Sequence, residues 1–145
     1  MILLEAESFL KNLKLLHGHE HTDGFRLCVI SPEGKASEHL IGQMTPANNE
    51  AFRKSALRKA LHLNARPEHI SSGQSRDPAA LMYSGAVRTK DGWIIAVAGL
   101  TEEWDEVASS VIAYMSGAVE FDEECWQRVQ SATNNPHMRA LPVGV

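Results

Sequence analysis

Residues 89–104 read TKDGWIIAVAGLTEEW, and this stretch decides the fold class. The Asp91-Gly92 pair between two apolar runs is a strong signal for a β-hairpin turn. Trp93 to Ala98 is nearly all apolar, which is typical of a central strand that is buried on both faces. Thr101 is a suitable N-cap residue, so a helix is expected to begin soon after this strand.

A second hairpin is expected upstream, over residues 25–41. Its arms, Phe25 to Ile30 and Ala36 to Ile41, flank a Ser-Pro-Glu-Gly-Lys turn in which proline and glycine supply the required backbone angles. The arm that precedes Asp91-Gly92 is expected at Met82 to Thr89. Hairpins pair antiparallel, so the sequence predicts an α/β (α+β) fold with a central antiparallel sheet of four or five strands flanked by helices. The residues expected to be strongly buried are Val29, Ile95 and Val97.

Apolar residues spaced three and four positions apart predict three helices, and an acidic segment that opens at Glu120 is expected to form a fourth. Their expected ranges are 1–17, 46–63, 101–117 and 120–132. We expect the first two to cover one face of the sheet, and the last two to cover the other face or to leave part of it to a partner. A single domain is predicted over residues 1–135, with a flexible tail over 136–145. The loop at 65–79 is long for a compact domain, which favours a functional or mobile segment.

Composition narrows the classes of protein to which the chain could belong. The 145 residues suit one domain, and their net charge of -4 argues against general nucleic-acid binding. Cys28 and Cys125 lie far apart and match no metal or disulfide motif. The first residues lack the basic character of a secretory signal, and no apolar run approaches the ~18 residues that span a bilayer. A cytoplasmic location without a membrane partner is therefore expected.

Several stretches, in the same order along the chain, resemble the GlcG/HbpS-like family, which includes PduO carboxy-terminal-type domains. A strand-turn pattern like VVDxxG is matched by Val29 to Gly34, and a helical KAxTA pattern is loosely matched by Arg58 to His62. A GGxPI pattern is loosely matched by Ser84 to Val87, where Gly85 alone replaces the double glycine. The most specific pattern, GxxxGAIGVSGxTxExDE, is matched in part by Gly92 to Glu106.

This resemblance implies a profilin-like or PAS-like sandwich that is often oligomeric and that, in some members, binds haem or a related tetrapyrrole. One of the two histidines His62 and His69 would then be an axial ligand, and Arg53 and Arg58 would hold the carboxylates of the haem. The alternatives without a ligand are that the histidines lie at a helix end and that the arginines belong to a solvated basic helix face, which also includes Lys54 and Lys59. An anion could bind at the start of the helix that follows Gly99 and Thr101, but the acidic residues of its first turn would repel the anion. The candidate cofactor-binding residues are His62, His69, Arg53, Arg58, Gly85, Gly99 and Thr101.

Other polar residues carry no catalytic or metal-binding prediction. His17, His19 and His21 alternate along a loop, but no cysteine or acidic partner has ligand spacing, so a solvated loop is preferred. Asp105 and Glu106 are interpreted as exposed acids of a helix start, because no nucleophile or histidine has a defined spacing to them. The sequence has no P-loop, dinucleotide fingerprint, GxSxG or HExxH motif.

These observations favour a small-molecule binding or sensing module, with haem or another tetrapyrrole as the candidate ligand. The alternatives are an uncharacterised enzyme that uses the same pocket and a structural or protein-interaction subunit. A homo-oligomer is expected, with a two-fold dimer as the first guess, because Trp93 to Ala98 needs cover on both sides. Three tryptophans and five methionines supply residues that interfaces use, and Trp93 and Trp104 could lie in the core or at an interface.

Overall fold

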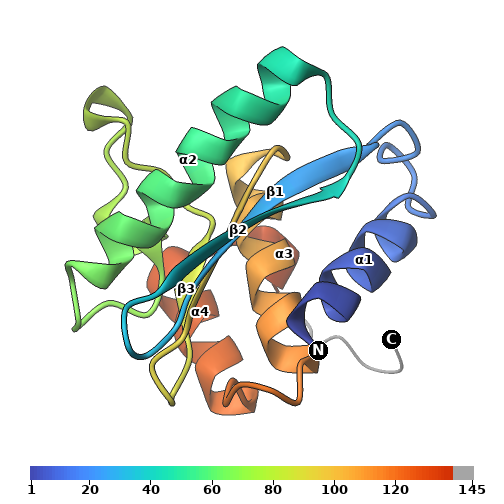
Figure 1. The fold of residues 1–145 in the computed structure, drawn as a ribbon. Helices are drawn as coiled ribbons and strands as arrows, with labels where there is room; N and C mark the ends of the chain where they lie inside the picture. The colour runs from blue at the N-terminus through green and yellow to red at the C-terminus, as the bar shows by residue number, and fades with distance from the viewer. Residues whose placement is uncertain (139–145) are drawn as a thin grey trace.

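The computed structural model describes residues 1–138 and shows an α+β fold (Figure 1). The helices are α1 (Ile2–Leu13), α2 (Pro46–Asn64), α3 (Glu102–Met115) and α4 (Glu123–Thr133). The strands are β1 (Gly24–Ile30), β2 (Ala36–Gly42), β3 (Ala86–Arg88) and β4 (Ile94–Ala98). Three short 3-10 turns complete the description, namely η1 (Ser72–Ser75), η2 (Pro78–Ala80) and η3 (Pro136–Met138).

The four strands form one antiparallel sheet in the order β2-β1-β4-β3. Both predicted hairpins are confirmed, and β4 is central because it pairs with β1 and with β3. Val29 of β1 lies opposite Ile95 of β4, and both are buried, as is Val97. The arm predicted at 82–89 is wrong in length, because only 86–88 pair as a strand and Gly85 before them has a left-handed φ of 132°.

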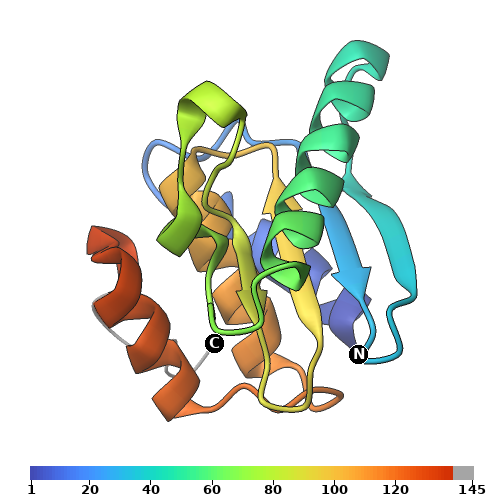
Figure 2. The same cartoon turned by 90° about the vertical axis from the view of Figure 1, so that its left-hand side faces the viewer.

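The helices divide between the two faces differently from the prediction. Figures 1 and 2 show α2 alone on one face, whereas α1 and α3 lie together on the other, with α4 beyond α3. The sheet's alternating side chains explain this division. Small residues such as Ala86 and Ala96 meet Ala56 and Ala60 of α2, so a single helix packs closely there. The opposite face carries larger side chains, including Phe25, and needs three helices to cover it.

Both ends of the chain differ from the prediction in detail. The first helix ends at Leu13 and not near residue 17, because the amides of Leu15 and Leu16 bond to carbonyls only three residues back. At the other end, the ordered domain extends beyond residue 135, since Met138 in η3 is fully buried. The remainder of the predicted tail, 139–145, lies outside the described residues. Within residues 1–138, no helix combines the length and the apolar character needed to cross a membrane.

Candidate functional site

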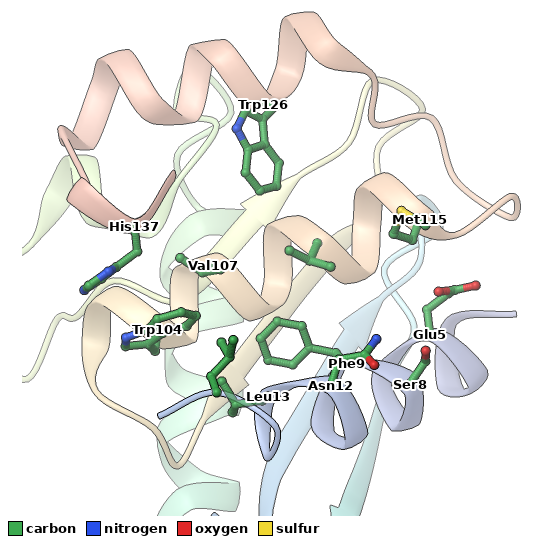
Figure 3. Close-up of a pocket in the computed structure, with 12 residues that line it drawn as sticks. Glu5, Ser8, Phe9, Asn12, Leu13, Trp104, Val107, Met115, Trp126 and His137 are labelled. Carbon is green, nitrogen blue, oxygen red and sulfur yellow. The ribbon is translucent and has the colours of Figure 1, made fainter. Parts of the chain in front are cut away.

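An apolar groove lies between α1 and α3 on the three-helix side of the sheet (Figure 3). Its volume is about 260 Å³. Figure 3 shows Phe9 and Leu13 of α1 lying opposite Trp104 and Val107 of α3, with Trp126 of α4 above them. The complete lining is Glu5, Ser8, Phe9, Asn12, Leu13, Leu16, Trp104, Val107, Val111, Met115, Trp126 and His137.

Helical spacing explains how the sequence builds this groove. In α3, Trp104, Val107, Val111 and Met115 recur at steps of three and four, so they form one stripe along the helix. The helix begins where Thr101 caps it, since the Thr101 side chain accepts a hydrogen bond from the Trp104 backbone N–H. This cap fixes Trp104 in the first turn, at one end of the stripe.

Polar side chains of α1 form the rim of the groove. Glu5, Ser8 and Asn12 also follow one another at steps of three and four, beside the buried Phe9 and Leu13. The sequence predicted no role for these three residues. A groove rim differs from an ordinary solvated helix face only because another helix lies opposite. The sequence alone does not show that α3 lies opposite α1.

Trp104 lies between two histidine rings at one end of the groove. The ring centroids of His19 and Trp104 are 4.7 Å apart in an edge-to-face arrangement. The His137 ring stacks on the same indole at 4.7 Å with an interplanar angle of 26°, and its Nε2 lies 3.3 Å from a Glu103 carboxylate oxygen. Trp104, for which the sequence left core and interface open, is thus half-buried in the lining of the groove. His137 falls in the predicted tail, so nothing in the sequence pointed to it.

The alternating histidines differ in their surroundings, and the predicted solvated loop does not describe all of them. His19 is not a freely solvated loop residue, because it packs on Trp104. His17 is fully exposed and lies 3.6 Å from Glu20. Among residues 1–138, no group of three or more histidine, cysteine or acidic side chains has a geometry that could hold a metal ion.

The groove's lining determines which ligand chemistry it can accept. Three aromatic rings, those of Phe9, Trp104 and Trp126, offer flat apolar surface. Among the described residues that line it, Glu5 is the only acid and none is Lys or Arg. The groove can therefore bury an apolar or aromatic group, and its electrostatics favour a neutral or cationic ligand over an anionic one.

A buried ion pair joins α2 to α3 beside β4. Lys59 Nζ lies 2.7 Å from Asp105 Oδ2 and donates a second hydrogen bond to the Val97 carbonyl at 3.0 Å. The two side chains are only 5% and 4% exposed. Burial raises the pKa of Asp105 to about 6, against the opposing charge of Lys59 and a hydrogen bond from the Leu100 N–H. The prediction that Lys59 and Asp105 are solvated is therefore wrong.

Gly85 has no side chain, and its absence leaves room for this ion pair. A Cβ at Gly85 would lie 2.7 Å from Lys59 Nζ, 2.7 Å from the Val97 carbonyl oxygen and 3.0 Å from the Asp105 Cβ. Its φ of 132° also disfavours any side chain. The helix spacing did contain a signal for this site, because Lys59 is three residues after Ala56 and four before Leu63 on the buried face of α2.

A second buried acid ties the predicted long loop to the helices. Glu106 is 1% exposed, so its interpretation as an exposed acid is also wrong. Its carboxylate accepts hydrogen bonds from Ser71 Oγ at 2.5 Å, Thr133 Oγ1 at 2.7 Å and Asn135 Nδ2 at 3.1 Å. Within the described part of the chain, no basic side chain lies within 4.0 Å of it. These three neutral donors anchor the 65–79 segment and the end of α4 to α3.

The other candidate residues lie apart from the α1–α3 groove. His62 is near the end of α2, where burial and the charges of Arg66 and Arg58 lower its pKa. His69 lines a separate cavity, and its Nδ1 is buried without a hydrogen-bond partner among residues 1–138. Arg53 is held by Glu50 at 2.8 Å and by Glu38 at 3.2 Å.

The two glycines and Thr101 have backbone roles. Gly85 accommodates the Lys59–Asp105 pair, and Thr101 caps α3. Gly99 has a φ of 126°, and a Cβ there would lie 3.2 Å from the Phe25 Cα. The structure brings Gly85 beside the ion pair, but it brings neither the two histidines nor the two arginines together around one cavity. These residues do not fit a shared haem pocket.

Comparison with protein-family models, with curated proteins and with solved structures finds no match to this chain.

Proposed function

We propose that this chain is a small-molecule binding or sensing module of the GlcG/HbpS-like type, and that its ligand occupies the α1–α3 groove. The observation that carries the proposal is the groove itself, which combines an aromatic and aliphatic lining with a few polar groups at its rim. Ligand sites in proteins commonly have this composition. No reaction is proposed, because none of the described lining residues has an evident catalytic task.

The family part of the proposal is supported by where the resembling motifs meet. Lys59 belongs to the helical pattern, Gly85 to the glycine pattern, and Val97 and Asp105 to the most specific pattern. Lys59 Nζ bonds to the Asp105 carboxylate and to the Val97 carbonyl, and the Val97 N–H donates a hydrogen bond to the Gly85 carbonyl. Motifs that are separate in sequence therefore converge on one structural feature, as expected if the patterns describe a common fold.

The size and charge of the groove support a ligand smaller than a tetrapyrrole. A volume of about 260 Å³ lies just below the roughly 300–1,000 Å³ that is typical of small-molecule sites. The carboxylates of a haem would find no Lys or Arg among the described lining residues, and Glu5 would repel them. We infer that the ligand is a neutral or cationic molecule built on one or two rings or on a short acyl chain.

Calorimetric titration with three ring compounds tests the proposal. Indole is neutral, whereas benzylamine and benzoate carry opposite charges on similar rings. We expect saturable one-to-one binding of indole or benzylamine, weaker binding of benzoate, and no change in the spectrum of added haem. The V111W variant, which fills the groove, should abolish binding. L61W adds the same side chain to the exposed surface of α2 and should bind as the wild type does. Equal affinities in the wild type, V111W and L61W, or no binding of any ring compound, would contradict the proposal.

The proposal also includes self-association, as the sequence led us to expect. Leu4 of α1 and Leu15, just after that helix, are 65% and 81% exposed, and α1 packs beside β2, whose outer edge pairs with no other described strand. A second copy could extend the sheet at β2 and cover these leucines in a two-fold contact. Light scattering at micromolar concentration should give twice the 16.0 kDa chain mass, and L15E should lower it. A wild-type mass near 16.0 kDa would show a monomer.

A further inference from the structure

A second cavity, distinct from the α1–α3 groove, gathers basic side chains. It lies between the segment at 67–70, the end of β3 and one side of α4, and its volume is about 280 Å³. Arg88, Lys90, Arg128 and His69 line it, and no acidic residue does so within the described part of the chain. The whole chain has a net charge of -4, so this concentration of positive charge is not a general property of its surface.

The charges of these residues are not equally balanced. Lys90 Nζ is paired with Asp122 at 2.6 Å and with Glu124 at 3.6 Å. Arg128 on α4 is exposed, and no carboxylate lies within 4.0 Å of its guanidinium among residues 1–138. Arg88 contacts carbonyl oxygens and no carboxylate, and the charge of Glu68 acts on it only without a direct hydrogen bond. Two arginines thus supply most of the positive field in this cavity.

The backbone of the α2 end holds Arg88 in place. Its Nη2 donates to the Leu63 carbonyl at 2.6 Å and to the Arg66 carbonyl at 3.1 Å, while its Nε donates to the His69 carbonyl at 3.0 Å. The third nitrogen, Nη1, donates to no protein group among the described residues. A fixed guanidinium with a remaining donor is a preorganised anion contact, because little side-chain entropy is lost when a ligand binds.

The same wall contains another unmet hydrogen-bonding group. His69 Nδ1 is buried and has no partner within residues 1–138. Buried polar atoms are usually satisfied, so an exception indicates a place where a water molecule or ligand completes the structure. His69 Nε2 lies 3.8 Å from Glu68, whose side chain is largely exposed.

We propose that this cavity is an anion site for phosphate, either free or as a phosphomonoester, with Arg88 and Arg128 as its binding residues. Guanidinium groups suit phosphate because their planar arrays of N–H donors match its oxygen atoms. The site is separate from the α1–α3 groove, and it shares no lining residue with it. The inference therefore stands or falls independently of the proposed function.

Calorimetric titration with inorganic phosphate and with glycerol 3-phosphate, at constant ionic strength, tests the site in the full chain. We expect saturable one-to-one binding, with the ester tighter if a phosphomonoester is the ligand and equal if free phosphate is. R128Q should weaken binding about tenfold, the value of one charge-assisted hydrogen bond. Arg128 is exposed, so this variant should fold normally.

K54Q provides the matched control, because Lys54 is an exposed cation on α2 that does not line the cavity. Its affinity should stay within about twofold of wild type, since screened surface charges contribute little. Equal weakening in R128Q and K54Q would show that phosphate responds only to overall charge, and the site would be rejected. Absence of saturable binding by the wild type would reject it as well.

Discussion

Replacing Lys59 with methionine should destabilise the fold strongly at neutral and alkaline pH. The K59M variant keeps most of the side-chain volume but leaves the Asp105 carboxylate, only 4% exposed, with the Leu100 N–H as its remaining hydrogen-bond donor. Removing one partner of a buried ion pair costs about 3–5 kcal/mol. A domain of this size has roughly 5–15 kcal/mol of stability, so the loss is a large fraction of the total.

The loss of stability in K59M should increase as the pH rises above 6. Burial already raises the folded-state pKa of Asp105 to about 6, from an ordinary value of 3.8, and removing Lys59 raises it further. Above pH 6 the wild-type carboxyl ionises, whereas the folded variant retains its proton. The deficit of K59M should therefore grow between pH 6 and 8 by up to about 1.4 kcal/mol per pH unit, and it should be nearly constant below pH 6.

Urea unfolding followed by circular dichroism measures both effects. The double variant K59M/D105N removes both charges, and the asparagine oxygen can still accept the Leu100 hydrogen bond. It should recover most of the lost stability, since replacing a buried pair with neutral groups is often tolerated. A deficit in K59M below about 1 kcal/mol at pH 8 would refute the buried pair, and a deficit that grows on acidification would refute its electrostatics.

Two further predictions concern the residues around this polar core. G85A should lower stability by roughly 2–4 kcal/mol, because its Cβ would lie 2.7 Å from the Val97 carbonyl oxygen at a φ of 132°; an unchanged thermal midpoint would show that the strand can shift instead. E106Q should cost about 1–3 kcal/mol, since its amide cannot accept all three hydrogen bonds of Glu106. Hydrogen exchange at Ser71 and Ser72 should accelerate in E106Q, and unaltered protection there would mean that Glu106 does not anchor the loop.

The sequence predicted the sheet well because its signals are local. The Asp91-Gly92 turn and the apolar run of β4 specify a hairpin without reference to the rest of the chain, and the helix N-cap at Thr101 is equally local. The distribution of helices over the two faces was wrong, because it depends on side-chain size across several strands. Ala86 and Ala96 set that size on the α2 face, and they become neighbours only when the strands pair.

The candidate site was less accessible to sequence reasoning. One wall of the groove, the stripe from Trp104 to Met115, follows from helical periodicity. Its opposite wall requires knowing that α1 packs beside α3, and His137 comes from a segment with no periodic signal. The sequence predicted solvated side chains for Lys59 and Asp105 because charged residues are usually exposed, although their spacing places both on buried helix faces.

The proposal of a ligand in the α1–α3 groove is tested most directly by an amide NMR titration with indole. The proposal predicts saturable shifts that gather on α1 and α3, centred on Phe9, Trp104 and Val111, and that disappear in V111W. Amides of α2, on the far side of the sheet, should stay unchanged. Shifts centred on α2, or none at millimolar indole, would contradict it.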